Sequence, residues 1–460
     1  MKPLILCICI LIIVTSCELS SSMKSSQVRQ EPSTVISQPA ETSTETITVF
    51  LTGNTYGSLK PCGCSGGQLG GLERRPAIFN TVPENKRLLI DTGSIIESKP
   101  IQDLQDLYKS AIIIQAFNYL NYDIVNLTEQ DIEITRGSLD GSATGYISSY
   151  ETDEQFSPGS QIQYELDGEH ISISVVAFDP EIIPIEYISE IFPGESEQKN
   201  VNILILSNDD EDAISDISQL GVVDCIISRV QSDEPTVESE PGEKPLVCSV
   251  GRFGRYISKI EIQKEPDGEL MLSFDDIPVK EEIETDEGLE QLYKIYQERV
   301  KQSGILGTNP RYPLDDGLEY IGSEACFSDS SDCHQYEYIV WMENKNHSQA
   351  YETLEQKGSQ YDPECIVCHV VGYEDETGYT TAEATPHLKD VGCEYCHGPG
   401  SAHFDNPYEN PTKPPIPLDQ TDLCEQCHTP EHSGDFAGHE EEYLQKIIHW
   451  TEPNDISNVK

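Results

Sequence analysis

The pentapeptide CEYCH, from Cys393 to His397, contains two cysteines separated by two residues and a histidine directly after the second cysteine. The same arrangement recurs as CIVCH and CEQCH. Two thiols at this spacing can bond to the two vinyl groups of one haem, and the following histidine then ligates the iron from below. The motifs therefore predict c-type haem attachment, with thioethers at Cys365, Cys368, Cys393, Cys396, Cys424 and Cys427 and proximal ligands at His369, His397 and His428.

Two other uses of paired cysteines were weighed against haem attachment. Cysteine pairs with two intervening residues also build zinc ribbons, but zinc does not require a histidine after every pair. Disulfides form in oxidising compartments, yet adjacent pairs repeated in this way are poor disulfide spacing. Haem attachment is therefore the interpretation that we adopt for all three motifs.

A fourth, irregular motif lies upstream in the stretch EACFSDSSDCHQ, where six residues separate Cys326 from Cys333 and His334 follows. Lengthening a flexible loop by four residues costs less than about 1 kcal/mol in closure entropy. We therefore expect a haem site with stretched spacing, with thioethers at Cys326 and Cys333 and His334 as proximal ligand. The alternatives are attachment through Cys333 alone and a site that is not assembled.

The histidines outside these motifs predict the second axial ligands. The chain has 11 histidines, and all except His170 lie in its last third. Such clustering beside haem motifs favours iron ligation over simple surface exposure. We expect distal ligands at His347, His387, His403 and His449, whereas His432 and His439 lie in a polar stretch and are expected to be bystanders.

The region from about residue 320 to residue 450 resembles the tetrahaem cytochrome c-554 family. The resemblance rests on YIGSEAC, CHQYEYIVWMENKNHSQAY, YDPECIVCHVVGY, TPHLKDVGCEYCHGPGSAH and CEQCHTPEHSGDF. It implies four closely packed haems in a mainly helical, loop-rich domain that transfers electrons. The family also tolerates a haem that lacks a second histidine, so not every candidate distal ligand has to be used.

The region from Ile47 to Ile277 has a different composition, with short apolar runs such as ITVFL, RLLID and VNILILS separated by helix-compatible segments. This pattern predicts an α/β domain with partly buried strands. The runs resemble, in order, those of the 5'-nucleotidase-type metallophosphoesterases, which implies a two-sheet α/β sandwich. Cys225 and Cys248 lie in such runs and are expected to be buried thiols, although a disulfide between them stays open.

The metal ligands of that family are replaced here. The D-x-H motif corresponds to Asn54-Thr55-Tyr56, the bridging Asp to Ser94, the Asn-His pair to Glu129-Gln130, the next His to Asn208, and the G-H-x-H ending to Ser228-Arg229-Val230-Gln231. Such enzymes need Asp and His ligands to hold two metal ions that activate water. We therefore expect no phosphoesterase activity and interpret the domain as a scaffold or docking platform. Cys62 and Cys64, in a glycine-rich loop, are either a reactive dithiol or part of a structural turn.

Charge and the first residues bear on partners and location. The chain has 81 acidic and 29 basic residues, which give a formal net charge of -52. Nucleic acid is therefore not an expected partner, whereas redox proteins with basic patches are expected partners. Residues 1–17 resemble a bacterial lipoprotein signal with lipid on Cys17, the alternatives being an ordinary secretory signal or a short membrane helix. An exported lipoprotein on the periplasmic face of a membrane is expected, and Glu18 favours the outer membrane.

The expected organisation has six parts: a signal at 1–17, a disordered tether at 18–45, the α/β domain at 46–280, a helical linker at 281–316, the tetrahaem domain at 317–450 and a tail at 451–460. The expected function is electron relay between redox partners. The alternatives are a haem enzyme that acts on a small nitrogen compound at an open-coordinated haem and a redox-sensing or docking protein.

Overall fold

The structure of the chain is a computed structural model. It describes residues 45–61, 66–97, 104–139, 144–150, 156–192, 199–239, 242–314, 317–327, 333–411, 422–429 and 432–449. The expected signal with Cys17, the tether, the loop cysteines Cys62 and Cys64 and the tail lie outside these ranges. No helix within them is both long and apolar enough to cross a bilayer.

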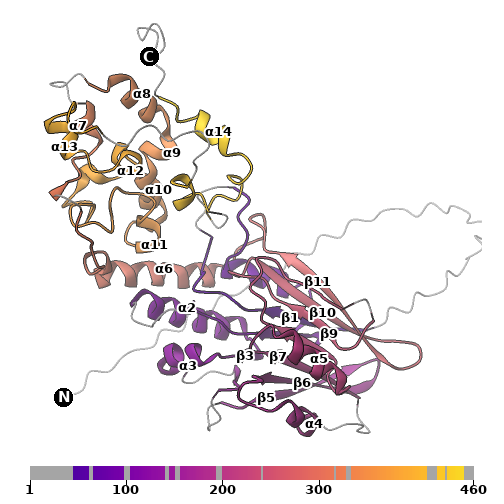
Figure 1. Ribbon diagram of the computed structural model, residues 1–460. Helices are drawn as coiled ribbons and strands as arrows, with labels where there is room; N and C mark the ends of the chain where they lie inside the picture. The colour runs from indigo at the N-terminus through magenta and orange to yellow at the C-terminus, as the bar shows by residue number, and fades with distance from the viewer. Residues whose placement is uncertain are drawn as a thin grey trace, which may run out of the picture. The chain divides into compact units, whose positions relative to one another are not determined.

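Two β-sheets form the centre of the α/β region (Figure 1). The first sheet has the order β11-β10-β1-β2-β3-β4, with β1 to β4 parallel and the β10–β11 hairpin antiparallel at one edge. The second has the order β5-β6-β7-β8-β9, with β6 to β9 parallel. The strands are β1 (Thr46–Thr52), β2 (Arg87–Asp91), β3 (Ile124–Asn126), β4 (Gly145–Ile147), β5 (Gly159–Leu166), β6 (Glu169–Phe178), β7 (Lys199–Leu206), β8 (Cys225–Ser228), β9 (Leu246–Ser249), β10 (Tyr256–Lys264) and β11 (Leu270–Pro278).

Alternation along the strands divides the apolar residues between two layers of core. In β7, Val201, Ile203 and Ile205 point into the core between the sheets, whereas Leu204 and Leu206 point to the opposite face. Successive side chains of a strand lie on opposite faces, so a nearly continuous apolar run fits a strand that is covered on both sides. The runs noted in the sequence are therefore buried strands, as predicted.

The two cysteines of this region are neighbours in the second sheet. Cys225 on β8 and Cys248 on β9 are buried free thiols, so no disulfide joins them. A hydrogen bond with Cys248, together with burial, raises the pKa of Cys225 well above its ordinary value. Both cysteines therefore serve as core residues, as expected.

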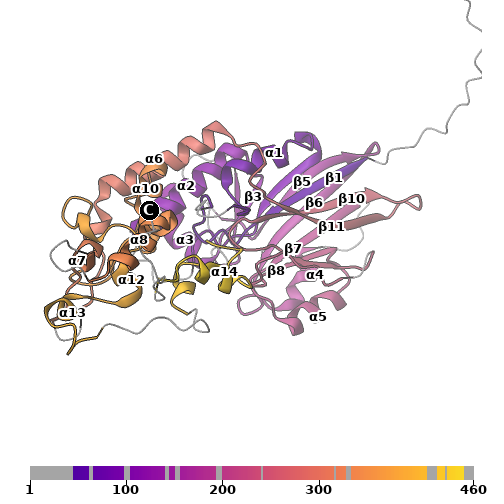
Figure 2. The same ribbon diagram turned by 90° about the horizontal axis from the view of Figure 1, so that it is seen from above.

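Helices cover the outer face of each sheet. The helices α2 (Leu104–Leu120) and α6 (Glu287–Ser303) lie side by side against the first sheet, and α4 (Ile188–Ile191) and α5 (Glu211–Gln219) lie against the second (Figure 2). Two shorter helices, α1 (Arg75–Phe79) and α3 (Glu129–Thr135), complete the first layer. The predicted two-sheet α/β sandwich is confirmed.

Helix ends follow local sequence signals. Thr128 and Asp131 form a capping box at the start of α3, and Asp210 and Asp286 accept backbone N–H bonds at the starts of α5 and α6. Gly304 ends α6 in the left-handed region, with φ 67°. Although α6 falls in the segment expected to be a linker, it packs against α2 as part of the first core.

The C-terminal region consists of short helices and loops. Its one described hydrophobic cluster is small and includes Tyr351, Ile366, Val370 and Tyr379. The helices are α7 (Ser323–Phe327), α8 (Gln335–Glu343), α9 (Lys345–Ser348), α10 (Ala350–Lys357), α11 (Pro363–Ile366), α12 (Cys393–His397), α13 (Ser401–Asp405) and α14 (Glu440–Gln445). The mainly helical, loop-rich character expected of this region is confirmed.

Candidate haem-binding site

Six histidines of the C-terminal region face each other in three pairs. Each pair joins the histidine of one Cys-His motif to a histidine from a different segment of the chain. The pairs, with the distances between ring centroids, are His334 with His403 (6.1 Å), His347 with His428 (6.3 Å) and His397 with His449 (6.0 Å).

This spacing fits axial ligation of an iron between the two rings. Two imidazoles on opposite sides of one metal ion, each with a metal–nitrogen bond of about 2 Å, have ring centres about 6 Å apart. Aromatic rings in ordinary edge-to-face contact also have centroids about 4.5–7 Å apart, so what distinguishes these pairs is that each contains the histidine of a Cys-His motif. The donor set is also suitable, because two axial histidines are a common ligation for a haem that transfers electrons.

Hydrogen bonds at Nδ1 orient several of these rings. A backbone carbonyl can only accept, so an Nδ1 that faces one carries the proton and leaves the Nε2 lone pair for a metal. Three rings donate in this way: His369 to Ala350 (2.6 Å), His403 to Asn410 (2.9 Å) and His449 to Ile447 (2.7 Å). A fourth, His428, has the hydroxyl of Ser433 at 3.0 Å from Nδ1.

Burial keeps three of the imidazoles neutral. Desolvation, and then the neighbouring His428, lowers the pKa of His347 to about 4. Desolvation also lowers the pKa of His369 and of His428. Because only the neutral imidazole offers a lone pair, these environments favour ligation at neutral pH.

His369 and His387 differ from the six paired histidines. His369 is oriented through Ala350, but within the described ranges its ring forms no such pair with one of the four expected distal ligands. His387 is exposed and lies beside Gly322, where a Cβ would be 3.1 Å from the His387 ring. Of the four expected distal ligands, the structure therefore pairs His347, His403 and His449, whereas His387 forms no histidine pair among the residues described.

The two expected bystander histidines, His432 and His439, follow the CEQCH motif in the sequence. The Nδ1 of His432 lies 2.9 Å from the hydroxyl of Thr429. The backbone carbonyl of His432 accepts a hydrogen bond from the side-chain amide of Gln68. His432 also lies close enough to His369 for its charge to contribute to the lowered pKa of that imidazole, after desolvation. His439 is exposed and occupies the N-cap position of α14.

The motif cysteines come together across motifs as well as within them. The thiols of Cys326 and Cys393 are hydrogen-bonded, and this bond lowers the pKa of Cys393 to about 7. Cys427 is similarly hydrogen-bonded to Cys368, and the hydroxyl of Tyr395 lies 3.0 Å from its sulfur. Cys326 thus lies against the CEYCH motif, and the loop that joins it to Cys333 falls outside the described residues.

Exposed apolar side chains accompany the histidine pairs. Helix α8, which directly follows His334, has no buried residue, and its Ile339 and Met342 are 36% and 46% exposed. Phe404, next to His403, is 54% exposed. Large apolar side chains beside paired imidazoles would provide a surface for burial of a haem macrocycle, so this region also fits the group.

A carboxylate that no sequence motif singles out organises the region between the motifs. The side chain of Glu394, inside CEYCH, is 3% exposed and accepts the backbone N–H groups of Ile321 (3.0 Å), Gly322 (2.6 Å) and Gly400 (2.7 Å). Three donors satisfy a buried carboxylate well. No local signal marks this role, because the residues between the two cysteines differ among the three motifs and Glu also occupies this position in CEQCH.

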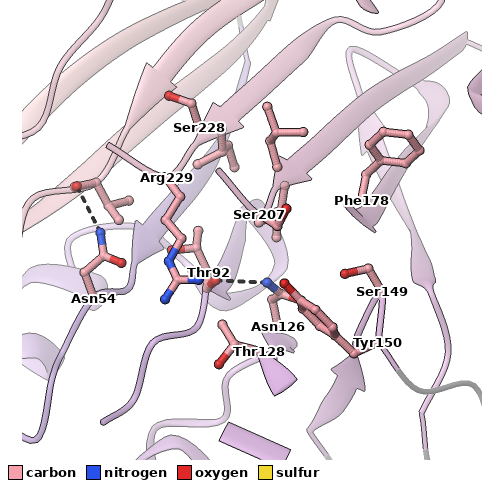
Figure 3. A pocket seen from close by; sticks show the side chains of 14 residues that line it. Asn54, Thr92, Asn126, Thr128, Ser149, Tyr150, Phe178, Ser207, Ser228 and Arg229 are labelled. Carbon is pink, nitrogen blue, oxygen red and sulfur yellow. Dashed lines mark hydrogen bonds between the residues drawn. The ribbon is translucent and has the colours of Figure 1, made fainter. Parts of the chain in front are cut away.

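A pocket in the sandwich lies where parallel strands of both sheets end (Figure 3). It is lined by amides, hydroxyls and one guanidinium, from Asn54 after β1, Asn126 at the end of β3, Ser207 after β7, and Ser228 and Arg229 at the end of β8. The Nδ2 of Asn126 donates to the Thr92 carbonyl at 3.0 Å, and that of Asn54 donates to Val250 at 3.5 Å. Asn54, Ser228 and Arg229, three of the positions singled out in the sequence, thus lie together at one pocket.

Backbone strain also marks this end of the sandwich. Asn54, Tyr56 and Ser94 adopt φ values of 48°, 47° and 61°, which non-glycine residues rarely do. Across the described ranges, no group of three or more His, Cys, Asp or Glu side chains is arranged to hold a metal ion.

Comparison with known proteins supports c-type haem binding in the C-terminal region. The family model for cytochrome c554 and c-prime matches residues 329–398. Cytochrome c-554 of Nitrosomonas europaea is 34% identical over 85 residues, which are 15% of this chain and 36% of that protein. The chain therefore spans about a third of the length of this relative. The resemblance inferred from the sequence is confirmed for this region.

Solved structures similar to the chain include nucleotidases. The 5'-nucleotidase precursor of Thermus thermophilus is 17% identical, with 61% of this chain and 63% of that chain covered and a TM-score of 0.43. A putative 5'-nucleotidase of Staphylococcus aureus, solved with alpha-ketoglutarate, is 13% identical, with 66% of each chain covered and a TM-score of 0.44.

Proposed function

We propose that the chain is an exported, lipid-anchored multihaem c-type cytochrome that relays electrons between redox proteins. The observation that carries the proposal is the set of three histidine pairs with ring centroids 6.0 to 6.3 Å apart, each containing the histidine of a Cys-His motif. Covalently attached haem supplies reversible one-electron chemistry when bound. The chain's own residues orient the imidazoles, keep them neutral and bury the macrocycle between apolar side chains.

Haem stoichiometry tests this proposal. Intact-mass spectrometry and a pyridine haemochrome assay of the purified mature protein should give four haems per chain. The Cys326→Ala variant should leave one haem singly linked or absent, whereas His334→Ala should change the absorption spectrum. A wild-type mass with three haems and an unchanged His334→Ala spectrum would show that the stretched motif is not a haem site.

Electron relay has its own readout. After reduction with dithionite, the protein should pass electrons to a basic c-type cytochrome, and the rate should fall as ionic strength rises because the chain has a net charge of -52. A reduced protein that no such acceptor oxidises would count against relay. For the anchor, Cys17→Ser should release the protein from membranes or stall its processing.

A second candidate, a haem enzyme for a small nitrogen compound, is favoured by one observation. None of the four expected distal histidines pairs with His369 among the described residues, so an iron ligated by His369 keeps one position open to a small molecule if the neighbouring His432 does not occupy it. A high-spin ferric spectrum that shifts on addition of hydroxylamine or nitric oxide, followed by turnover, would favour this candidate over simple relay. Binding without turnover would leave electron relay as the function.

A further inference from the structure

Four buried polar side chains meet where helices α2 and α6 of the sandwich contact the loop before the CIVCH motif. Gln105 and Lys109 come from α2, Tyr296 comes from α6, and Asp362 directly precedes α11. All four are at most 7% exposed. The motif itself begins three residues after Asp362, at Cys365.

Asp362 is the centre of this cluster. One carboxylate oxygen accepts the Gln105 amide at 2.7 Å, and the other accepts the Tyr296 hydroxyl at 2.8 Å. The Gln105 amide also donates to the Tyr296 hydroxyl at 2.8 Å, which closes a three-membered network. Since each member is tied to the other two, the position of Asp362 is fixed by the sandwich.

The same carboxylate starts the helix that carries the first motif cysteine. Asp362 is the N-cap of α11 and accepts the backbone N–H of Glu364 at 3.0 Å, and Pro363 occupies the first helical position. Glu364 in turn pairs with Lys109 at 2.5 Å. Two residues at the start of this short helix, Asp362 and Glu364, are thereby attached to α2.

Electrostatics make the network sensitive to change. Burial raises the pKa of Asp362, whereas the Lys109 ammonium and the donors on Tyr296 and Glu364 act in the opposite direction. The hydrogen bonds and the nearby cation favour the charged carboxylate, and they oppose the effects of burial and of the neighbouring Glu364 carboxylate, which raise the pKa. Removing one member of such a buried pair leaves the other charge uncompensated.

Further contacts join the sandwich to the same loop. Gln297 on α6 donates to the Lys357 carbonyl at 2.8 Å and to the Ser359 hydroxyl at 3.1 Å. Tyr361 packs against both the first sandwich core and the C-terminal cluster. The contact between α6 and this loop thus extends from Lys357 to Asp362.

We propose that Gln105, Tyr296 and Asp362 are positioning residues that fix the CIVCH motif to the sandwich and set the reduction potential of the haem attached there. The inference rests on the proposed function, because it requires a haem at Cys365 and Cys368. It gives the sandwich a structural role, which is to hold one redox centre in place. A negative charge fixed near a haem stabilises the oxidised state, so the carboxylate lowers the potential.

The test is a redox titration of the full-length haem protein by spectroelectrochemistry. The component that belongs to this haem is assigned by its loss in a Cys365→Ala/Cys368→Ala variant. In Asp362→Asn, that component should move to higher potential while the haem count and the other components stay unchanged. In Lys109→Met, which removes the neighbouring cation, the same component should move to lower potential.

Gln115→Leu is the matched control for Gln105→Leu, because Gln115 lies on the same helix but is exposed. Gln105→Leu should increase hydrogen exchange in residues 362–369 and shift the assigned potential, whereas Gln115→Leu should do neither. Unchanged potentials in Asp362→Asn and Lys109→Met, or equal shifts of all components, would overturn the inference. A wild-type protein without haem on Cys365 and Cys368 would instead overturn the proposed function at this motif.

Discussion

The sandwich and the C-terminal region of this chain differ in how many apolar side chains they bury. The sandwich has three apolar clusters, one between its sheets and one under each helical layer, and many of their residues are completely buried. The C-terminal region has one small described cluster, and α8 buries nothing. The first region therefore has a core of its own side chains, whereas the second has few buried apolar side chains, which fits the proposal that haem supplies part of its core.

Their polar residues differ in the same way. In the sandwich, Thr52 donates to Asp91 at 2.6 Å and Arg75 donates to Tyr122 at 2.9 Å, so buried polar groups satisfy one another. In the C-terminal region, three pairs of imidazoles have ring centroids 6.0 to 6.3 Å apart, a spacing that an iron between the rings would fit. Side chains that satisfy one another stabilise a fold unaided, whereas ligands that face a gap contribute only once the metal is bound.

The largest expected effect is the loss of haem. In a chain whose three intact motifs carry Cys→Ala substitutions, residues 333–411 and 422–449 should lose hydrogen-exchange protection, because the cluster around Ile366 is too small to order them. Strands β1 and β7 should stay protected. Exchange mass spectrometry with the haem-loaded chain as control measures both regions at once. Loss of protection in both regions, or in neither, would contradict the contrast drawn here.

A substitution in the core between the sheets should affect the sandwich and leave the haem region unchanged. Ile203→Ala removes a side chain with 0% exposure from between the sheets and should lower the free energy of unfolding of the sandwich by about 2–5 kcal/mol. The haem spectrum should not change. Ile182→Ala, at a position that is 51% exposed, is the control and should cost less than about 0.5 kcal/mol. Chemical denaturation followed by circular dichroism, with the haem absorption recorded in parallel, would reveal any coupling between the regions.

The third expected effect is a pH dependence specific to the sandwich. Burial raises the pKa of Asp91 from its ordinary value of 3.8 to about 6. Between these values the folded state binds more protons than the unfolded state, so stability falls as pH rises from about 4 to about 6, by about 3 kcal/mol in total. Asp91→Asn should flatten this part of the stability profile. An unchanged slope in denaturation curves over this pH range would rule out Asp91 as its source.

The last prediction is that added metal ions produce no hydrolytic activity. With added Mn²⁺ or Zn²⁺ the purified protein should not hydrolyse a nucleotide or a phosphodiester above the rate of the metal alone, because amides, hydroxyls and Arg229 line the sandwich pocket. A known metallophosphoesterase assayed in parallel serves as the positive control. Metal-dependent turnover that disappears in Arg229→Ala would show that the sandwich is not merely a scaffold.

The sequence determined those features that depend on neighbouring residues. Two motif cysteines and the adjacent histidine, as in Cys393 to His397, lie close enough along the chain to define a candidate haem attachment site before any folding. Alternation in runs such as VNILILS likewise specifies a strand that is buried on both faces, because successive side chains point in opposite directions. The structure confirms the strand, and Asp210 caps α5 through an equally local interaction.

Only the tertiary structure decided which distant residues meet. Nothing local pairs His334 with His403 or leaves His387 outside the described pairs, since each partner is supplied by a separate segment whose position depends on packing. The same is true of Gln105 and Asp362, which lie in different regions and are joined by a 2.7 Å hydrogen bond. The number of residues between two motif cysteines is fixed by the sequence. A contact between remote segments, in contrast, forms only after burial has fixed both segments in place.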